Sequence, residues 1–481
     1  MFLNNFHHEL RTYGRSRWTL LIIVLFFGLT FFALHNGAEI VAERQLSIDE
    51  EVQRMDSLDA FRAARILAIE ENREAPPPPE ESWRDPRDLW DMAYNTRRVI
   101  AMEPQPLTLI AAGQSDLFPH VVKPHIYKED YRLEFSELAN PVQLLFGTFD
   151  LAFVCIYLLP LLVLALSFNV LSSARESGIL PLIAAQPISL YGWLLQKLFI
   201  RFLLLSLLVL VAILVGLGLQ GVNLTDNLPS LSLLLGALLT YMLFWFGVAF
   251  AVNLLGQPSG TNAITLVALW LGIVLFIPTI IAQTTNTLNP IPSRVNIIHE
   301  YREAYSGAVK NIDKIMDAYL LDHPELDTQD ESVENRYGFM LRTFASAGVI
   351  NEAIDPVLNA HQAALDKQQA WVNQLTVLSP ALLLQKVFNQ TAGTTTAHYV
   401  DFRRQIIDFT EKWKAYLKPR MFANEYLQSG DFEAFPRYEY STEQVPSYFG
   451  QLLLLLVSFT LLAGGISFLI YQSKQGNLVI T

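Results

Sequence analysis

The chain has 481 residues, of which 52% are hydrophobic and only 17% charged, and its formal net charge is −12. Soluble domains are about a quarter charged, so neither a disordered chain nor an ordinary soluble enzyme is expected. The acidic balance argues against nucleic acid as a partner, because proteins bind its phosphates with Lys and Arg. The single cysteine, Cys155, excludes an intrachain disulfide and any metal site built from several cysteines.

Residues 1–17 carry a short amphipathic pattern. Leu3, Phe6, Leu10 and Tyr13 recur at steps of three and four, while the charged residues fall on other faces. The pattern predicts a helix in the headgroup region of the inner membrane surface. A frayed tail is the alternative.

Six stretches have the roughly 20 mostly apolar residues that a membrane span needs. They cover residues 18–35, 142–171, 193–219, 230–255, 261–283 and 448–471. Buried helices of a large soluble protein are the alternative, which six such runs in one chain disfavour. The first stretch is also longer than the roughly 7–15 apolar residues of a secretory signal, so we expect it to remain as an anchor. The sequence therefore predicts an α-helical integral membrane protein with six transmembrane helices.

Charge predicts the orientation of these spans. The segments placed inside hold more basic than acidic residues: Arg11, Arg15, Arg17, Arg175, Lys197, Arg201 and Lys474 against Glu9 and Glu176. The short loop 220–229, placed outside, has no Lys or Arg. Because Lys and Arg in short loops set topology, we expect a cytoplasmic N-terminus and a cytoplasmic tail at 472–481.

A few polar residues and prolines stand out within the spans. Asp150, near the outer end of the second span, is either a substrate-path or gating residue or, as we prefer, one exposed to headgroups or capped by an outer domain. Lys197 and Arg201 are expected to reach the inner headgroups. Pro160 is expected to kink the second span, close to Tyr157.

Two loops, 36–141 and 284–447, are large enough to form outer domains. The first begins with a charged run that is expected to continue the first span outward as a helix until Pro76–Pro79 end it. Beyond it, prolines suggest irregular or short-strand structure, in which His120 and His125 are expected to be solvated rather than metal-binding.

The second loop is predicted to be mainly helical, from apolar residues at steps of three and four. The expected helices are Glu300–Leu321, Glu334–Ala347, Pro356–Leu378, Pro380–Phe388 and Tyr399–Leu417, with a turn-rich break at Asn389–Thr396.

Motifs for catalysis are missing from the sequence. It has no GxxxxGK[ST] phosphate loop, no GxSxG and no HExxH. We therefore expect no enzyme activity, no cofactor and no metal in this chain.

The inner loop 172–192 is the most informative segment. The pair Arg175-Glu176 is followed by Gly178, a short apolar run and Gln186-Pro187. Pro181 suits a first helical turn and Pro187 ends the helix at Gln186. This predicts a short projecting helix whose apolar face needs a partner. An interfacial loop without a partner is the alternative.

These residues carry a resemblance to a known family. Tyr157-Leu158-Leu159-Pro160, Phe168-Asn169-Val170 and the run with Glu176, Gly178, Leu180, Gln186 and Pro187 resemble ABC-2-type permeases, in particular the subfamily with a DUF3526 ectodomain. Leu378-Ser379-Pro380-Ala381 and Ala392-Gly393-Thr394 are similar to that ectodomain. Ile179 and Pro181 depart from the family pattern.

The resemblance implies a six-helix ABC-2, or type V exporter-like, fold with two large, mainly helical extracytoplasmic insertions in the bacterial inner membrane. The chain would be the permease subunit of an ABC transporter, with export as the expected direction of an unidentified substrate. A separate ABC ATPase, binding ATP and Mg, would dock on the coupling helix, at Arg175, Glu176, Gly178, Leu180, Gln186 and Pro187. A second permease copy, membrane lipids and an envelope protein at the outer domains are the other expected partners. Residues 1–17 would be the connecting helix.

A membrane scaffold or force transducer that transports nothing is the second hypothesis for this chain. Its outer domains would bind an envelope partner. A co-purifying ATPase would favour the transporter. A membrane-bound hydrolase is the third hypothesis, which the lack of a nucleophile motif disfavours.

Overall fold

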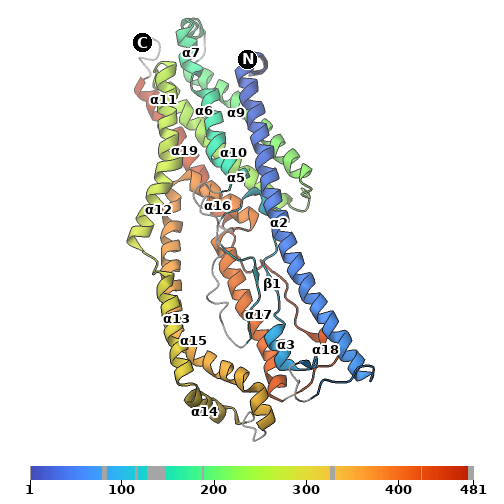
Figure 1. Ribbon diagram of the computed structural model, residues 1–481. Coiled ribbons are helices and arrows are strands. Elements are labelled where there is room, and N and C mark those ends of the chain that lie inside the picture. Colours follow the sequence, from blue (N-terminus) through green and yellow to red (C-terminus); the bar gives the residue numbers. More distant parts are fainter. Residues whose placement is uncertain are drawn as a thin grey trace.

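The computed structural model describes residues 2–78, 84–113, 118–126, 148–186, 189–324, 331–423 and 425–474, and most of these residues are helical. The molecule is elongated: a bundle of apolar helices fills one half and a narrower region extends from it (Figure 1). We call the end of the bundle that holds the first helix the α1 end, and the extension on the opposite side the distal region. The last described helix, α19 (Phe449–Lys474), also ends at the α1 end.

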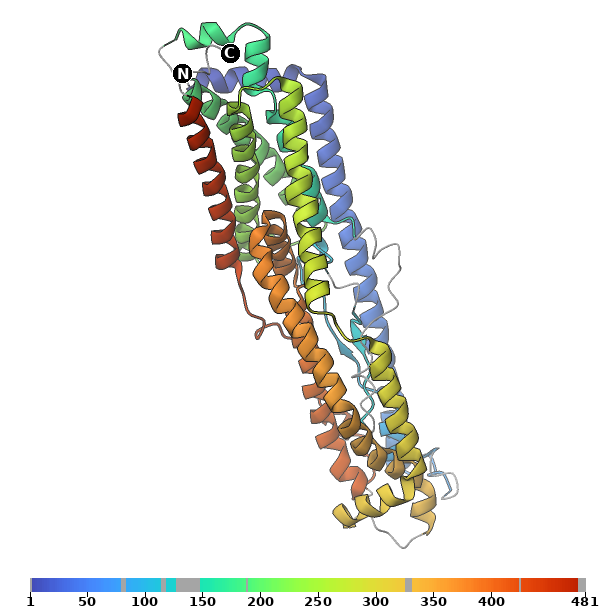
Figure 2. The same cartoon turned by 90° about the vertical axis from the view of Figure 1, so that its left-hand side faces the viewer.

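Two helices open the chain. α1 (Phe2–Arg15) lies across the α1 end, turned away from the axis of α2 (Arg17–Glu70), as Figure 2 shows. Ser16 separates them, and its hydroxyl accepts a hydrogen bond from the backbone N–H of Thr19 at 3.3 Å. α2 has 54 residues, so it extends for about 80 Å and leads from the bundle far into the distal region. The predicted continuation of the first span as a helix is thereby confirmed.

In the part of the chain that the structure describes, six helices are long and apolar enough to cross a membrane. Two of them are composite. The second consists of α5 (Leu151–Phe153), a π-helical turn η5 (Val154–Leu158), α6 (Leu159–Ser167) and α7 (Val170–Glu176). The fifth consists of α11 (Ser259–Trp270), a π-helical turn η6 (Leu271–Phe276) and α12 (Ile277–Leu288). The first is α2, and the others are α9 (Leu190–Leu219), α10 (Leu228–Leu254) and α19 (Phe449–Lys474).

The core of the bundle forms around α10. It packs against α6, α9, α11 and α19, and it supplies the fully buried side chains of Tyr241 and Trp245. Many large apolar side chains on the outside of the bundle are exposed, among them Leu207, Ile264 and Leu454. Such surfaces are typical of helices that face lipid.

The distal region is built from segments that lie far apart in the sequence. Its first part holds α3 (Leu89–Asn95), β1 (Ile100–Ala101), the 3₁₀ turn η2 (Thr108–Ile110) and β2 (Val121–Val122), which pairs antiparallel with β1. Its second part holds α13 (Arg294–Lys310), α14 (Ile312–Asp322), α15 (Glu331–Leu375), the 3₁₀ turn η8 (Thr376–Leu378), α17 (Thr396–Phe422) and α18 (Asp431–Ala434). Between η8 and α17, α16 (Pro380–Ala392) returns to the bundle and packs against α10 and α19. The short strands agree with the irregular or short-strand structure expected from the prolines.

Arg98 joins three parts of the distal region. Its guanidinium lies 4.7 Å from the ring centre of Trp413 in α17 and 4.8 Å from that of Phe435. Two hydrogen bonds, at 2.5 and 3.1 Å, connect it to the carboxylate of Asp59 in α2. The two ring centres are 5.2 Å apart, so the cation lies beside both rings and faces a carboxylate, and both kinds of contact favour its charge. Arg98 therefore fixes α2 to α17.

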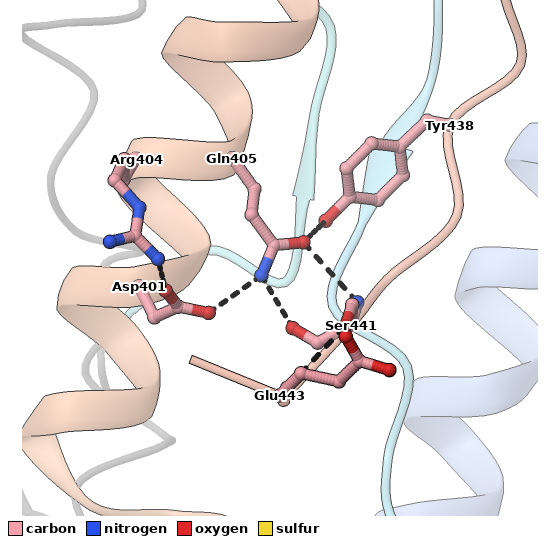
Figure 3. A network of polar contacts seen from close by, with 6 residues as sticks. All are labelled: Asp401, Arg404, Gln405, Tyr438, Ser441 and Glu443. Atoms are coloured by element: carbon pink, nitrogen blue, oxygen red, sulfur yellow. Dashed lines mark hydrogen bonds and ion pairs between the residues drawn. The ribbon is translucent and has the colours of Figure 1, made fainter. Parts of the chain in front are cut away.

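A second polar network holds the segment after α18 against α17 (Figure 3). The amide of Gln405 donates to the carboxylate of Asp401 at 2.7 Å and to the carbonyl of Ser441. Its oxygen accepts from the hydroxyl of Tyr438 at 3.0 Å and from the backbone N–H of Ser441 at 3.3 Å. One side chain thus satisfies several groups of the returning chain. We assign this network a structural role.

Two expectations for the helices of the distal region were wrong. The single helix expected at Glu300–Leu321 is interrupted at Asn311, between α13 and α14. Conversely, α15 continues through Pro356, where a new helix was expected to begin. A proline costs one hydrogen bond of the helix, but Ile354 and Leu358 on either side of it pack against α13. This packing outweighs the local signal.

The expected solvation of the two loop histidines is also wrong. His125 is only 6% exposed, and burial, together with the charge of Arg44, lowers the pKa of His120 to about 3. Both side chains therefore belong to the packed part of the distal region.

Candidate functional site at the break in the second span

The second span is interrupted near the α1 end. α6 ends at Ser167 and α7 begins at Val170, with a turn at Phe168 and Asn169 between them. A break of this kind frees backbone groups that a continuous helix would pair internally. At membrane depth such groups need partners from the protein itself.

Three other spans supply these partners. Arg201 of α9 donates to the carbonyl of Leu166, Asn253 of α10 to that of Ser167 at 2.9 Å, and Asn262 of α11 to that of Phe168 at 3.2 Å. The oxygen of the Asn253 amide also accepts from the backbone N–H of Leu171 at 3.1 Å. Asn253 and Asn262 are almost fully buried. Side chains from α9, α10 and α11 thus hold the break.

The end of α7 is attached to the turn between α10 and α11. The carboxylate of Glu176 accepts hydrogen bonds from the backbone N–H of Ser259 at 2.8 Å and from its hydroxyl at 2.9 Å. α11 has no side-chain cap at Pro258, so Glu176 provides from α7 the anion that a helix N-terminus favours. Arg175 donates to the carbonyl of Gly256, whose φ of +70° closes the turn. The predicted residues Arg175 and Glu176 therefore contact their own chain.

Beyond this attachment, the chain turns at Gly178, which has a φ of +72° and open space on the side where other residues carry a side chain. α8 (Leu180–Ala184) follows, with Pro181 in its first turn as expected. The Leu180 side chain is buried, but Leu182 is 69% exposed and Ile179 50%. Gln186 is exposed as well, whereas Pro187 lies outside the described residues. α7 lies at the extreme top of the molecule in Figure 1, so this short element projects from the α1 end.

Asp150 lies at the opposite end of the second span. It is 6% exposed, and its carboxylate accepts from the backbone N–H of Phe153 at 2.8 Å and from that of Ala112 at 3.0 Å. The first contact caps α5, and the second connects the span to the distal region. This geometry agrees with the interpretation of Asp150 as a capped residue.

Tyr157 lies in the π-helical turn η5 near the start of the span, and Pro160 follows in the first turn of α6. Proline has no N–H to donate to the carbonyl four residues earlier, which here is that of Ile156. The hydroxyl of Tyr241 in α10 takes this place and donates to Ile156 at 3.0 Å. Tyr157 itself is half-buried and contacts the ring of Phe153 at a centroid distance of 5.0 Å. The irregular turn is thus supported by a neighbouring span.

Lys197 and Arg201, which were expected to reach the inner headgroups, pair with α1. Both contact the carboxylate of Glu9 in α1, Lys197 at 3.1 Å and Arg201 at 2.9 Å. Burial acts to raise the pKa of Glu9, but the charges and hydrogen bonds of the two cations outweigh it and lower this pKa. An ionised carboxylate of α1 is therefore paired with the foot of α9 inside the protein.

Several of these residues were not predicted as site residues from the sequence. Asn253 and Asn262 lie in or beside apolar runs, where a polar side chain is a signal by itself. Glu9 and Ser259 carried no such signal, because their roles depend on residues 192 and 83 positions away.

Comparison with known families and proteins gives one match. A family described as "Domain of unknown function (DUF3526)" matches residues 294–441. The match begins at α13 and ends in the segment after α18, so it covers the second part of the distal region and none of the six apolar helices. No curated protein matches the chain. No solved structure matches it.

Proposed function

We propose that this chain is the membrane-spanning subunit of an ABC transporter and that it couples ATP hydrolysis by a separate ATPase to the transport of a substrate. The observation that carries the proposal is the element α7–α8. It exposes Ile179 and Leu182 at its tip while Arg175 and Glu176 attach its base to the α10–α11 turn. Exposed apolar side chains on a firmly attached base are suited to receive a partner and to pass its movement on.

The attachment gives such a movement a defined route. A displacement of α8 acts on α7, whose end contacts the N-terminus of α11 through Glu176. It also acts on the break, which precedes Leu171 in the chain and is held by side chains of α9, α10 and α11. One docked partner could thus bias four spans at once, as alternating access requires. The orientation follows from the same proposal: the α1 end is cytoplasmic and the distal region extracytoplasmic. The sequence resemblance to ABC-2-type permeases and the DUF3526 match support it.

The test uses two leucines with comparable exposure at opposite ends. Leu182→Glu places a charge on the tip of α8, and Leu321→Glu places one on α14 in the distal region, where the leucine is 83% exposed. We expect an ATPase to co-purify with the wild-type chain in mild detergent. Leu182→Glu should weaken its binding by about 30-fold, the loss typical of a central interface residue, and Leu321→Glu should leave binding unchanged. No ATPase in the preparation, or equal binding to both variants, would contradict the proposal.

A scaffold or force transducer is the second candidate, and the length of α2 favours it. One uninterrupted helix connects the α1 end to the far part of the distal region, where Asp59 joins it to Arg98. Such a rod could pass a force without any transport. Capture of an envelope protein by the distal region, with no ATPase at α8, would select this candidate.

A further inference from the structure

Arg201 contacts two parts of the structure, α1 and the break in the second span. The route proposed above, from α8 to the spans, does not include α1. Its Nε donates to the carboxylate of Glu9 in α1 at 2.9 Å, and its Nη1 donates to the carbonyl of Leu166 at the break. The Arg201 side chain is 14% exposed and that of Glu9 only 2%. One guanidinium therefore joins α1, its own helix α9 and the end of α6.

The geometry of a guanidinium makes these two contacts depend on one another. Its nitrogens form a rigid, planar fork, so the position of Nε fixes where Nη1 points. While Glu9 holds Nε, Nη1 is directed at Leu166. If the carboxylate leaves, the long side chain is free to turn toward water, and Leu166 loses a charged donor.

We propose that α1 controls the break in the second span through Glu9 and Arg201. With α1 docked on α9, Arg201 completes the set of side chains that holds the break closed. When α1 moves away, Arg201 is released and the α6–α7 junction opens. The inference that α1 regulates coupling rests on the proposed function. The inference that α1 affects the break does not depend on that function.

Lys197 provides a matched control on the same helix. It also pairs with Glu9, at 3.1 Å, and its ammonium lies 4.9 Å from the ring centre of Trp193. Its described contacts do not reach the break. Lys197→Gln therefore removes one of the two cations from Glu9, while Arg201 still holds α1 on α9 and the connection from Glu9 through Arg201 to Leu166 is retained.

The test is amide hydrogen exchange of the purified chain in lipid nanodiscs, without any ATPase, followed in a peptide that covers residues 166–178. Glu9→Ala should speed exchange in this peptide by at least roughly tenfold, the effect of losing one hydrogen bond to a charged group. Arg201→Lys should do the same, because a lysine keeps the charge but cannot make both contacts. Lys197→Gln should exchange like the wild type. Peptides of α17 serve as a reference for global unfolding.

Each result is decisive for the inference. Wild-type exchange in Glu9→Ala would overturn it, and so would an equal increase in Lys197→Gln, which would indicate general loosening of α1. If Glu9→Ala does not fold, Arg201→Lys decides in its place: wild-type exchange at the break would overturn the proposal. Because the assay contains no ATPase, a negative search for that partner would refute the proposed function and leave the exchange result standing.

Discussion

The distal region and the α1 end each depend on a poorly exposed arginine, but the two arginines are bound differently. Arg98 lies beside the rings of Trp413 and Phe435 and pairs with one carboxylate. Arg201 has a carboxylate on one side and a backbone carbonyl at a helix break on the other. The first arrangement has one favourable geometry and acts as a fixed joint. In the second arrangement, water or another donor can replace Arg201 at the carbonyl. This contact can therefore break and form again, as a connection between moving helices requires.

The largest loss of stability is expected from Arg98→Ala. It leaves Asp59, whose side chain is 15% exposed, without its cation, and breaking such a buried pair costs about 3–5 kcal/mol. Thermal unfolding followed by tryptophan fluorescence would report it, since Trp413 lies beside the guanidinium.

Arg54→Ala is the matched control for this variant. Arg54 also lies on α2, but its contact with Glu51 is 3.7 Å long and its side chain is 68% exposed. An exposed pair contributes about 0–1 kcal/mol. Equal stability of the two variants would show that Arg98 does not fix the distal region.

At the α1 end, Asn253→Leu is expected to have the next largest effect. It removes the contacts to Ser167 and Leu171 and leaves both backbone groups of the break without a donor or acceptor. The loss should be about 1–3 kcal/mol in a detergent unfolding series. Asn262→Leu loses a single bond of 3.2 Å and should cost about 0.6 kcal/mol. The reverse order would contradict the assignment of Asn253 as the main support of the break.

Tyr241→Phe should cost about 1 kcal/mol, because it removes only the hydroxyl that donates to Ile156. The role of Pro160 can be separated from it by a double-mutant cycle. Pro160→Ala restores a backbone N–H that can reach Ile156, so Tyr241→Phe should cost clearly less in that background. Additive losses would show that the hydroxyl does not replace the donor that the proline lacks.

The same comparison shows how far the sequence predicts this structure. Apolar run length is a local property, and it predicted the six long helices. The helical pattern of the charged run after the first span is local as well, and it predicted the continuation of α2. The motif around Glu176 located the projecting element, but the partner of Glu176, Ser259, could not be predicted, because it depends on how α7 and α11 pack. Pro356 was misread for a related reason: its local signal is strong, and the packing of Ile354 against α13 that overrides it is not local.

The smallest effect on stability is expected from Glu176→Ala, although this variant tests most directly whether movement passes from α7 to α11. Glu176 is exposed, and its contacts are to the first residue of α11. Thermal unfolding should therefore stay close to that of the wild type. Exchange of the Ser259 amide should increase, because its acceptor is gone. If α7 passes movement to α11 through this carboxylate, ATP hydrolysis by a bound ATPase should continue while transport falls. Glu443→Ala, an exposed acid beyond α18, is the control. Unchanged coupling in Glu176→Ala would leave the break, held by Arg201, Asn253 and Asn262, as the connection between α8 and the spans.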